Sequence, residues 1–378
     1  MGHTVVLGGG MVGSIMALDL AQDADRTVQI VDRDEHRLAA VVKQDAHIEP
    51  ICADLSDCSA ISEILTSADL VLGALPSRLG LQTLRTVIES GKPYCDITFT
   101  PEDAWELAPL AKAHEVVAVI DCGVAPGMTN LLAGVAARQL QPCTSIDMWV
   151  GGIPKHPVPP WNFKAAFSPF DVVDEYLRPA RIVRDGQVIV REALSDLDHI
   201  DLPQVGMLEA FNTDGLRSLT ATLDVPNLVE KTLRYPGHRD LAWACRETGL
   251  WSEEPIEVDG QEVIPRDVTC AALFPHWTYA PGEGDLTILR VEARGMLNGA
   301  PSVLRWDLYD ELDPATGWSS MARTTAFPAT IVARLIEQGV ISEPGVYAPE
   351  ALAVNAEVGE TLMRELQARG VDYRGTTA

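Results

Sequence analysis

The first 120 residues of the chain alternate between short apolar runs and longer segments with apolar positions at helical spacing. The apolar runs are Val5–Leu7, Thr27–Val31, Ile48–Cys52, Leu70–Ala74, Tyr94–Ile97 and Val116–Asp121. The amphipathic segments between them are Met11–Gln22, Glu35–Lys43, Ala60–Leu65, Leu79–Ser90 and Glu102–His114. Short apolar strands that alternate with helices are typical of a parallel sheet covered by helices on both faces. The pattern therefore predicts a doubly wound α/β domain over this part of the chain.

Beyond Pro126 the pattern changes to one that favours hairpins. Arg181–Val190 and Ile288–Leu304 contain Asp185-Gly186 and Asn298-Gly299, dipeptides that suit a tight hairpin turn. Other β-rich runs lie at Ser145–Val150, Gln187–Arg191 and Val303–Tyr309, and helical spacing occurs over Met128–Leu140, from about Thr324, and over Ala356–Arg369. We therefore expect a second domain of the α+β class with a mixed sheet.

This organisation predicts two domains. Residues 1–125 form the first domain, residues 126–324 form a substrate-binding and dimerisation domain, and helices within residues 325–378 return to pack on the first domain. The strand edges of a hairpin-rich domain have to be covered. We therefore expect a two-fold homodimer, or a dimer of such dimers, with the second domain at the interface.

A nucleotide-binding fingerprint follows the first predicted strand. Gly8-Gly9-Gly10-Met11-Val12-Gly13 has the spacing G-x-G-x-x-G and opens a helix. Gly8 permits the tight turn, Gly10 lets the backbone approach a pyrophosphate, and Gly13 lets the helix pack close to the strand. Asp32 ends the second strand 19 residues after Gly13, where a carboxylate can bind the ribose hydroxyls of NAD and repel a 2′-phosphate. The first domain is thus predicted to be a Rossmann domain that binds NAD.

Several further residues are candidates for the same cofactor site. Arg33 can stack on adenine or help to bind a phosphate, which leaves NADP open as an alternative to NAD. Asp54 follows the third strand and lies either near the adenine or in a solvated loop. The turn Ala74-Leu75-Pro76 closes the fourth strand, where the chain is expected to pass the nicotinamide ribose. Asp96 and Asp121 end two later strands at the carboxyl edge of the sheet, where ligands bind in such folds.

Composition argues against several classes of binding partner and of metal site in this protein. The chain has 54 acidic and 29 basic residues and a formal charge of −25, which disfavours nucleic acid and anionic membranes. Its apolar runs are far shorter than the ~18 residues of a membrane span, and no basic leader precedes Thr4–Leu7, so we expect a cytoplasmic protein. The seven cysteines show no C-x-x-C spacing and the eight histidines no metal-ligand spacing. We therefore expect free thiols and no zinc site.

Motifs spread along the chain resemble the saccharopine dehydrogenase-like family. They are the first domain, Asp121–Asn130, Val150–Pro154, Phe167–Asp171 and Lys231–His238. Within that family, Trp161–Lys164 and Asp171–Arg181 are most similar to the lysine 6-dehydrogenase branch. The resemblance implies NAD-dependent oxidative deamination of the ε-amino group of L-lysine, whose aldehyde product cyclises to a piperideine carboxylate. It also implies a two-domain subunit that commonly forms a homodimer.

The chemistry of amine oxidation selects candidate residues in the second domain. Hydride leaves a carbon that bears a neutral amine, so a base has to remove a proton, and a base also has to activate water to hydrolyse the imine. Lys164 is a candidate for that base, or its charge could bind a carboxylate; Asp96 is the other candidate base. Asp171 and Glu175 lie on one face if Pro169 starts a helix, and could hold an ammonium group. Arg217 and Arg234 are candidate carboxylate clamps, and the Thr98 hydroxyl could reach the substrate.

One departure from the family favours an amine substrate. Members that make saccharopine tend to have an asparagine-arginine pair in the segment matching Phe211–Gly215, and that arginine suits the glutamate arm. Here the arginine is missing and Asp214 is present. A saccharopine- or carboxynorspermidine-type reductase using NAD(P)H is the alternative enzyme, and a dinucleotide-binding sensor is the alternative from another class.

Overall fold

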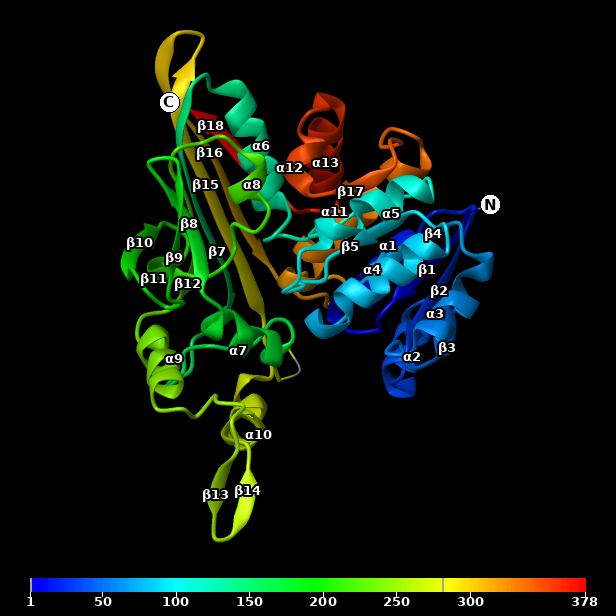
Figure 1. The fold of residues 1–378 in the computed structure, drawn as a ribbon, viewed down its shortest axis with the longest axis horizontal. Coiled ribbons are helices and arrows are strands. Elements are labelled where there is room, and N and C mark those ends of the chain that lie inside the picture. The colour runs from blue at the N-terminus through cyan, green and yellow to red at the C-terminus, as the bar shows by residue number, and fades with distance from the viewer. Residues whose placement is uncertain (1, 281) are drawn as a thin grey trace. The chain divides into compact units, whose positions relative to one another are not determined.

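The computed structural model describes residues 2–280 and 282–378, which divide into two compact units. The first unit comprises Met1–Val135 and Ala322–Asp372, and the second comprises Ala136–Met321 and Tyr373–Ala378. Each unit is built around its own sheet (Figure 1). The predicted combination of a doubly wound parallel sheet with a second domain carrying a mixed sheet is confirmed.

The first unit contains a seven-stranded parallel sheet in the order β17-β6-β5-β4-β1-β2-β3. Its strands are β1 Gly2–Leu7, β2 Arg26–Asp32, β3 Glu49–Cys52, β4 Leu70–Gly73, β5 Tyr94–Asp96, β6 Val117–Val119 and β17 Gly345–Tyr347. Because β1 pairs with both β2 and β4, the strand order reverses beside β1. The carboxyl end of the sheet at such a reversal is where α/β proteins bind ligands.

Helices cover this sheet. They are α1 Met11–Leu20, α2 Glu35–Gln44, α3 Cys58–Ile64, α4 Gly80–Glu89, α5 Ala108–Ala113, α6 Met128–Gln139, α11 Ser320–Glu337, α12 Pro349–Leu352 and α13 Ala356–Ala368. The apolar faces of α3, α4 and α5 pack on strand residues with almost no exposed surface, including Val5, Leu7 and Val71. Burying a side chain of this size contributes ~1.5–3 kcal/mol, which makes this core the main stabilising element of the unit.

One predicted helix is wrong in its extent. The segment expected to form a single helix over Glu102–His114 begins as a 3-10 turn, Ala104–Leu107, and only then continues as α5. Asp103 caps the turn by accepting a hydrogen bond from the Trp105 N–H at 3.0 Å. Pro109 lies in the first turn of α5, a position where the missing N–H of proline costs nothing, so a new helix starts there.

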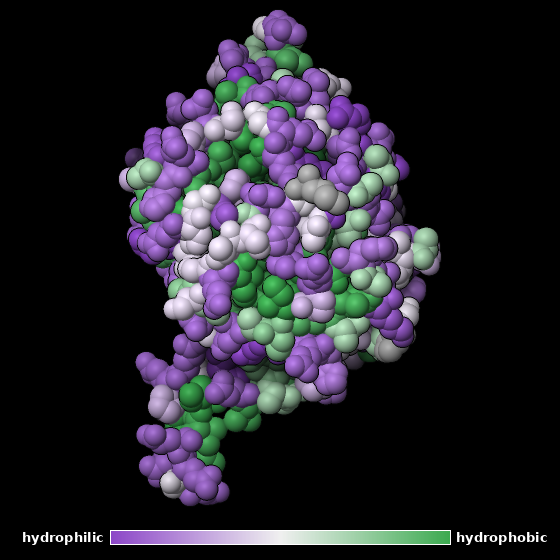
Figure 2. Space-filling model, turned by 90° about the vertical axis from the view of Figure 1, so that its right-hand side faces the viewer, coloured by the Kyte–Doolittle hydropathy of each residue, from purple (hydrophilic) through white to green (hydrophobic). Residues whose placement is uncertain are grey.

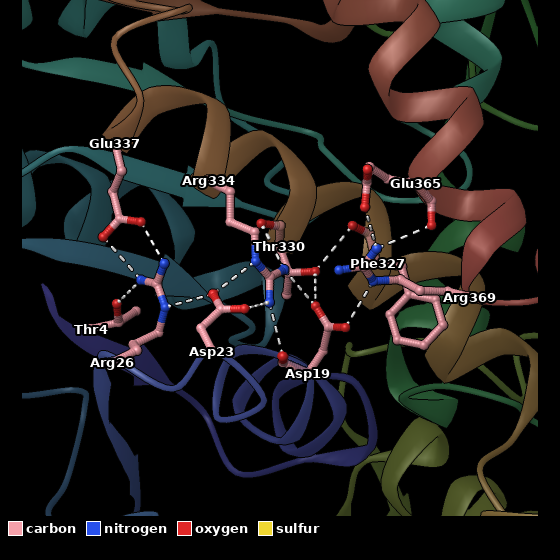
Figure 3. Close-up of polar contacts among 10 residues, drawn as sticks. All are labelled: Thr4, Asp19, Asp23, Arg26, Phe327, Thr330, Arg334, Glu337, Glu365 and Arg369. Atoms are coloured by element: carbon pink, nitrogen blue, oxygen red, sulfur yellow. Dashed lines mark hydrogen bonds and ion pairs between the residues drawn. The ribbon is translucent and has the colours of Figure 1, made fainter. Parts of the chain in front are cut away.

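The C-terminal helices are bound to α1 by a buried ionic cluster (Figure 3). Asp19 of α1 accepts hydrogen bonds from Thr330 at 2.6 Å, Arg334 at 2.7 Å and Arg369 at 2.8 Å. Arg334 also bonds Asp23 at 2.9 Å. Residues more than 300 positions apart in the sequence therefore share one charged cluster within the first unit.

The second unit contains a nine-stranded mixed sheet. Its main path is β10-β11-β12-β7-β15-β16-β18, with β8 pairing both β12 and β9. The strands are β7 Cys143–Pro154, β8 Ala180–Arg184, β9 Gln187–Arg191, β10 Asp198–Leu202, β11 Gly206–Asn212, β12 Leu228–Arg234, β15 Asp285–Leu297, β16 Ala300–Glu311 and β18 Arg374–Thr377. The two predicted hairpins are confirmed as β8–β9 and β15–β16. Asp185 and Asn298 have positive φ, as do the glycines that follow them, which is the conformation a tight hairpin turn requires.

Shorter elements complete the second unit. They are α7 Pro169–Leu177, α8 Leu219–Thr222, α9 His238–Glu247, α10 Pro265–Trp277 and the small hairpin β13 Ile256–Val258 with β14 Gln261–Val263. Pro169 starts α7 as predicted, with Ser168 as its cap. Aromatic residues including Phe163, Tyr176 and Trp277 pack between α7, α9 and α10.

The face of the molecule drawn in Figure 2 is mostly hydrophilic, with apolar patches between the polar side chains. Among the described residues, no helix combines the length and the apolar character needed to cross a bilayer. The same part of the chain has no group of three or more His, Cys, Asp or Glu side chains placed to hold a metal ion.

Candidate active site

The fingerprint loop is shaped by close backbone contacts that only glycine permits. Gly8 has φ +106°, and a Cβ there would lie 2.3 Å from the carbonyl oxygen of Ala74. A Cβ on Gly13 would lie 1.8 Å from the carbonyl oxygen of Gly8. By contrast, a Cβ on Gly10 would meet nothing within 4 Å. Gly8 and Gly13 are therefore required by the fold itself, whereas Gly10 faces open space beside the N-terminus of α1.

This open space fits the pyrophosphate of a dinucleotide. Gly10 caps α1 without a side-chain hydrogen bond, and the first N–H bonded back into the helix is that of Ser14, to Gly10. The N–H groups of Met11, Val12 and Gly13 have no carbonyl to bind within the helix, and the helix dipole adds positive potential there. An anion is the natural ligand for such an arrangement.

Replacing Gly10 and replacing Gly13 with alanine should have different effects. We expect Gly10→Ala to leave the free energy of unfolding within about 0.5 kcal/mol of wild type, because its φ of −71° suits alanine, but to weaken dinucleotide binding roughly tenfold or more. Gly13→Ala, the matched control, should cost ~1–3 kcal/mol of stability because of its clash with Gly8. Chemical denaturation without nucleotide measures the stability of each variant, and fluorescence titration with NADH measures its affinity for the dinucleotide. Wild-type affinity in Gly10→Ala would contradict the pyrophosphate assignment.

Asp32 lies beside the fingerprint, as its spacing predicts. Its carboxylate accepts hydrogen bonds from the Gly9 N–H at 2.7 Å and the Asp34 N–H at 2.9 Å. Arg37 approaches the same carboxylate to 3.9 Å, and Arg33 is exposed. Each carboxylate oxygen can accept a second hydrogen bond, so Asp32 can also bind ribose hydroxyls. Arg33 and Arg37 at this strand end would suit a 2′-phosphate.

The other predicted cofactor residues take up ordinary turn positions. Asp54 is exposed and accepts hydrogen bonds from the N–H and hydroxyl of Ser56, which lower its pKa. Ala74 closes β4 with its N–H bonded to Leu7, directly against Gly8. Pro76 precedes a short 3-10 turn. The structure thus brings the Ala74–Pro76 turn next to the fingerprint and gives Asp54 a local capping role.

Asp96 is a buried carboxyl group at the carboxyl end of β5. It accepts hydrogen bonds from the Thr98 hydroxyl at 2.6 Å and the Thr98 N–H at 2.9 Å. Burial raises the pKa of Asp96 to about 6; Thr98 opposes this shift and the negative charge of Asp121 adds to it. A carboxyl group with a pKa near the working pH is suited to proton transfer. Thr98, which is also a predicted substrate ligand, orients Asp96 and accepts a hydrogen bond from the Leu75 N–H at 3.3 Å.

In the second unit, Lys164 is partly buried and held by two oxygen atoms. Its ammonium group donates to the Thr278 carbonyl at 3.1 Å and forms an ion pair with Glu283. It also lies over the ring of Tyr279, 5.8 Å from the ring centre. The structure therefore shows Lys164 as a paired cation.

Arg234, a candidate carboxylate clamp, is buried and already has partners within the protein. Its Nε donates to the Tyr176 hydroxyl at 2.8 Å, and its guanidinium lies 3.7 Å from Glu175 and stacks on Phe163. Burial lowers the pKa of His238 to about 3, so this imidazole is neutral. Its Nδ1 faces the Trp161 carbonyl at 3.1 Å and must donate, so its Nε2 accepts from Tyr176 at 2.9 Å. The chain of hydrogen bonds runs from Arg234 to the Trp161–Lys164 segment.

The predicted acids are also partly paired. Asp171 and Glu175 lie on α7 with half-buried side chains, and Glu175 accepts a hydrogen bond from Thr232 at 2.6 Å. Asp214 forms a two-point ion pair with Arg181, at 2.9 and 2.8 Å. Arg217 lies in a left-handed turn at φ +50°.

Sequence reasoning missed two residues of this region, Glu230 and Tyr279. Glu230 is fully buried, and burial, with Glu175 and Asp214 nearby, raises its pKa to about 8. Its Oε2 has no hydrogen-bond partner among the described residues, and neither has the Tyr279 hydroxyl. The alternation of Glu230, Thr232 and Arg234 along β12 was the available signal for a polar face. Tyr279 lies just after the C-cap residue of α10, Thr278, and has no such signal.

Comparison with known proteins identifies relatives of the whole chain. A profile of the saccharopine dehydrogenase NADP binding domain matches residues 4–119, and one of the saccharopine dehydrogenase C-terminal domain matches residues 123–371. The L-glutamate-forming, NADP(+) saccharopine dehydrogenase of Saccharomyces cerevisiae is 20% identical over 97% of this chain and 96% of the relative. The mitochondrial alpha-aminoadipic semialdehyde synthase of Mus musculus is 20% identical over 98% of this chain but 47% of its own length. The apo structure of the yeast enzyme superposes over 100% of both chains with a TM-score of 0.82 at 19% identity.

Proposed function

Because this chain belongs to the saccharopine dehydrogenase family, we propose that it is an NAD-dependent amino-acid dehydrogenase that oxidises the ε-amino group of L-lysine. The products are the aldehyde, which cyclises to a piperideine carboxylate, together with ammonium and NADH. The family supports an oxidoreductase with a nicotinamide cofactor. The choice of lysine and of NAD is our proposal, as is a homodimer in the cytoplasm.

The proposal that lysine is the substrate rests on the charged groups around β12 and α7. Three carboxyl groups, those of Glu175, Asp214 and Glu230, lie near one another there. The two guanidinium groups that reach them, of Arg181 and Arg234, are each already paired with one of the acids. The glutamate arm of saccharopine would need additional cations, whereas both guanidinium groups here are already balanced by Glu175 and Asp214. Glu230, whose pKa is raised to about 8 by burial, can ionise when a cation approaches, so the cluster suits the ammonium group of lysine.

The reaction needs one proton acceptor and one bound water. Asp96 is the candidate base, because burial places its pKa at about 6 and Thr98 fixes its orientation. It can take a proton from the substrate ammonium and later from the water that adds to the imine. A nicotinamide bound at the fingerprint loop would supply the acceptor for the hydride that leaves the carbon carrying the nitrogen. Water supplies the aldehyde oxygen, and ammonia takes up a proton and leaves as ammonium.

A saccharopine-type or carboxynorspermidine-type reductase is the second candidate. It is favoured by the match to saccharopine dehydrogenases over almost the full length of both chains. Purified protein incubated with NAD or NADP and with L-lysine, D-lysine, L-ornithine or saccharopine separates the two functions, with NADH or NADPH absorbance as readout. Oxidation of saccharopine but not L-lysine would overturn the proposed substrate.

The same screen tests the cofactor through Asp32. We expect Asp32→Ala to weaken NAD binding by ~1.5–3 kcal/mol and to reduce discrimination against NADP, because hydrogen bonds to a charged acceptor are lost. Asp54→Ala is the comparison, since the Asp54 carboxylate is exposed and bonded to Ser56. Calorimetric titration with both dinucleotides measures the effect. A wild-type protein that already prefers NADP would show that Asp32, with Arg33 and Arg37 beside it, does not select NAD.

A further inference from the structure

The carboxylate paired with Lys164 is that of Glu283, which lies in a turn and not in a helix or strand. Glu283 lies just before β15, and its side chain is 39% exposed, whereas that of Lys164 is 14% exposed. The hydrogen bond from Lys164 lowers the pKa of Glu283, with a second contribution from the Ala280 N–H at 2.7 Å. Ion pairs with one exposed partner on a turn are weak, so another carboxylate can replace Glu283 at small cost.

Tyr279 supplies a second hydrogen-bonding group at the same place. Its hydroxyl is inaccessible to solvent and has no hydrogen-bond partner among the described residues. A buried hydroxyl without a hydrogen-bond partner destabilises the fold, so a ligand that accepts its hydrogen bond is favoured at this place. Burial, and next the charge of Asp285, raises the pKa of Tyr279 well above its usual value, so the phenol keeps its proton and can donate.

The neighbouring charged groups are committed elsewhere. Asp285 accepts hydrogen bonds from the N–H groups of Ser320 at 2.7 Å and Met321 at 2.9 Å, at the start of α11. Lys155 forms its own ion pair with Glu311. Tyr235 donates its hydroxyl to the Pro154 carbonyl at 3.1 Å. What remains for a ligand at this place is an ammonium group and a neutral phenol, a pair of donors that complements a carboxylate.

We propose that Lys164 and Tyr279 form a subsite for the α-carboxylate of the substrate, and that Glu283 occupies this subsite until the substrate displaces it. The inference rests on the proposed amino-acid substrate and gives Lys164 the role of binding a carboxylate, in place of the clamp expected from Arg234. The Glu283 carboxylate then competes with the α-carboxylate of the substrate for Lys164. Lysine and saccharopine both carry an α-carboxylate, so the subsite serves either substrate.

The test compares L-lysine with 1,5-diaminopentane, which is lysine without its carboxylate. Glu283→Gln removes the competitor and should lower the KM for L-lysine about two- to fivefold. Tyr279→Phe should raise it roughly three- to tenfold, and Lys164→Met roughly ten- to hundredfold. None of these variants should change the KM for 1,5-diaminopentane by more than about twofold. Glu311→Gln is the matched control, because it breaks the Lys155 ion pair in the same unit and should change neither KM.

The outcomes separate this inference from the proposed function. If the wild type oxidises L-lysine and Glu283→Gln leaves its KM unchanged or raises it, the subsite is wrong and the function stands. If the wild type does not oxidise L-lysine, the proposed substrate is wrong, and the subsite is tested by calorimetric binding of saccharopine. Tighter saccharopine binding by Glu283→Gln and weaker binding by Tyr279→Phe would then support the subsite, and unchanged binding in both would overturn it. Thermal unfolding of each variant checks that it is folded.

Discussion

Replacing Asp96 with asparagine is expected to lower kcat by roughly 10²–10⁴-fold, the usual contribution of a positioned base, while making the protein more stable. Asparagine keeps the oxygen that accepts the two hydrogen bonds from Thr98 but cannot take a proton. Loss of activity together with a gain of stability excludes unfolding as the cause. Steady-state kinetics with the accepted substrate, and chemical denaturation of the same samples, measure both effects.

The expected gain of stability follows from the direction of the pKa change. Asp96 has a pKa of about 6 in the folded chain against 3.8 for an ordinary aspartate, so the folded state holds its proton more tightly than the unfolded state. This contribution to stability is fully present below pH 3.8 and is lost as pH rises through about 6. The pKa difference between the folded and unfolded states corresponds to a loss of roughly 3 kcal/mol of folding stability at neutral pH. Asp96→Asn should recover part of this loss.

The pH dependence of activity provides an independent check on Asp96. As a base it has to be ionised, so oxidation should accelerate as pH rises through about 6. A further increase is expected above neutral pH, because only the free amine, with an ordinary pKa of ~10, can give up a hydride. Asp147→Asn is the control, since burial also raises the pKa of Asp147, but its carboxylate is paired with Arg294 and is not a candidate base. A kcat for Asp96→Asn within threefold of wild type would assign the base elsewhere.

Removing the carboxylate of Asp19 should destabilise the first unit by about 3 kcal/mol, because two arginines and a threonine lose their shared partner (Figure 3). Asp19 is 7% exposed, so water cannot replace the lost hydrogen bonds freely. Asp19→Ala measured by chemical denaturation gives the effect. Asp23→Ala is the comparison: Asp23 bonds the same Arg334, but its side chain is 38% exposed, so a smaller loss is expected.

The cluster around Asp19 should also weaken in acid. Burial by itself raises the pKa of Asp19, but attraction by Arg334 and Arg369 outweighs it, so the pKa lies below 3.8. The stabilisation is therefore present above pH 3.8 and is lost as pH falls further. The difference in stability between wild type and Asp19→Ala should shrink below that pH. A difference that stays constant from pH 7 to pH 3 would mean that the charge of Asp19 does not stabilise the cluster.

Features with a local cause were predictable from the sequence. Gly8, Gly10 and Gly13 act within six residues of one another, and the conformation of the loop follows from the absence of side chains at those positions. The Asp185-Gly186 and Asn298-Gly299 turns are likewise set by residues that tolerate positive φ. The helix expected over Glu102–His114 failed for a local reason too, because the capping by Asp103 and the start favoured by Pro109 outweighed the apolar spacing.

The roles of the charged residues were decided by the tertiary structure. The sequence identified Lys164, Glu175, Asp214 and Arg234 as candidates, but not that Arg234 binds Tyr176, that Asp214 binds Arg181, or that Lys164 pairs with Glu283. The partners of Lys164 and Arg234 in these pairs are 119 and 58 residues away along the chain. Their pairing depends on how β12, α7 and the turn before β15 pack, and spacing in the sequence carries no record of that packing. By itself the sequence determined the two-domain α/β design and the nucleotide loop, because glycine positions and apolar periodicity act over a few residues; only the folded chain determined which charges neutralise one another and which remain for a substrate.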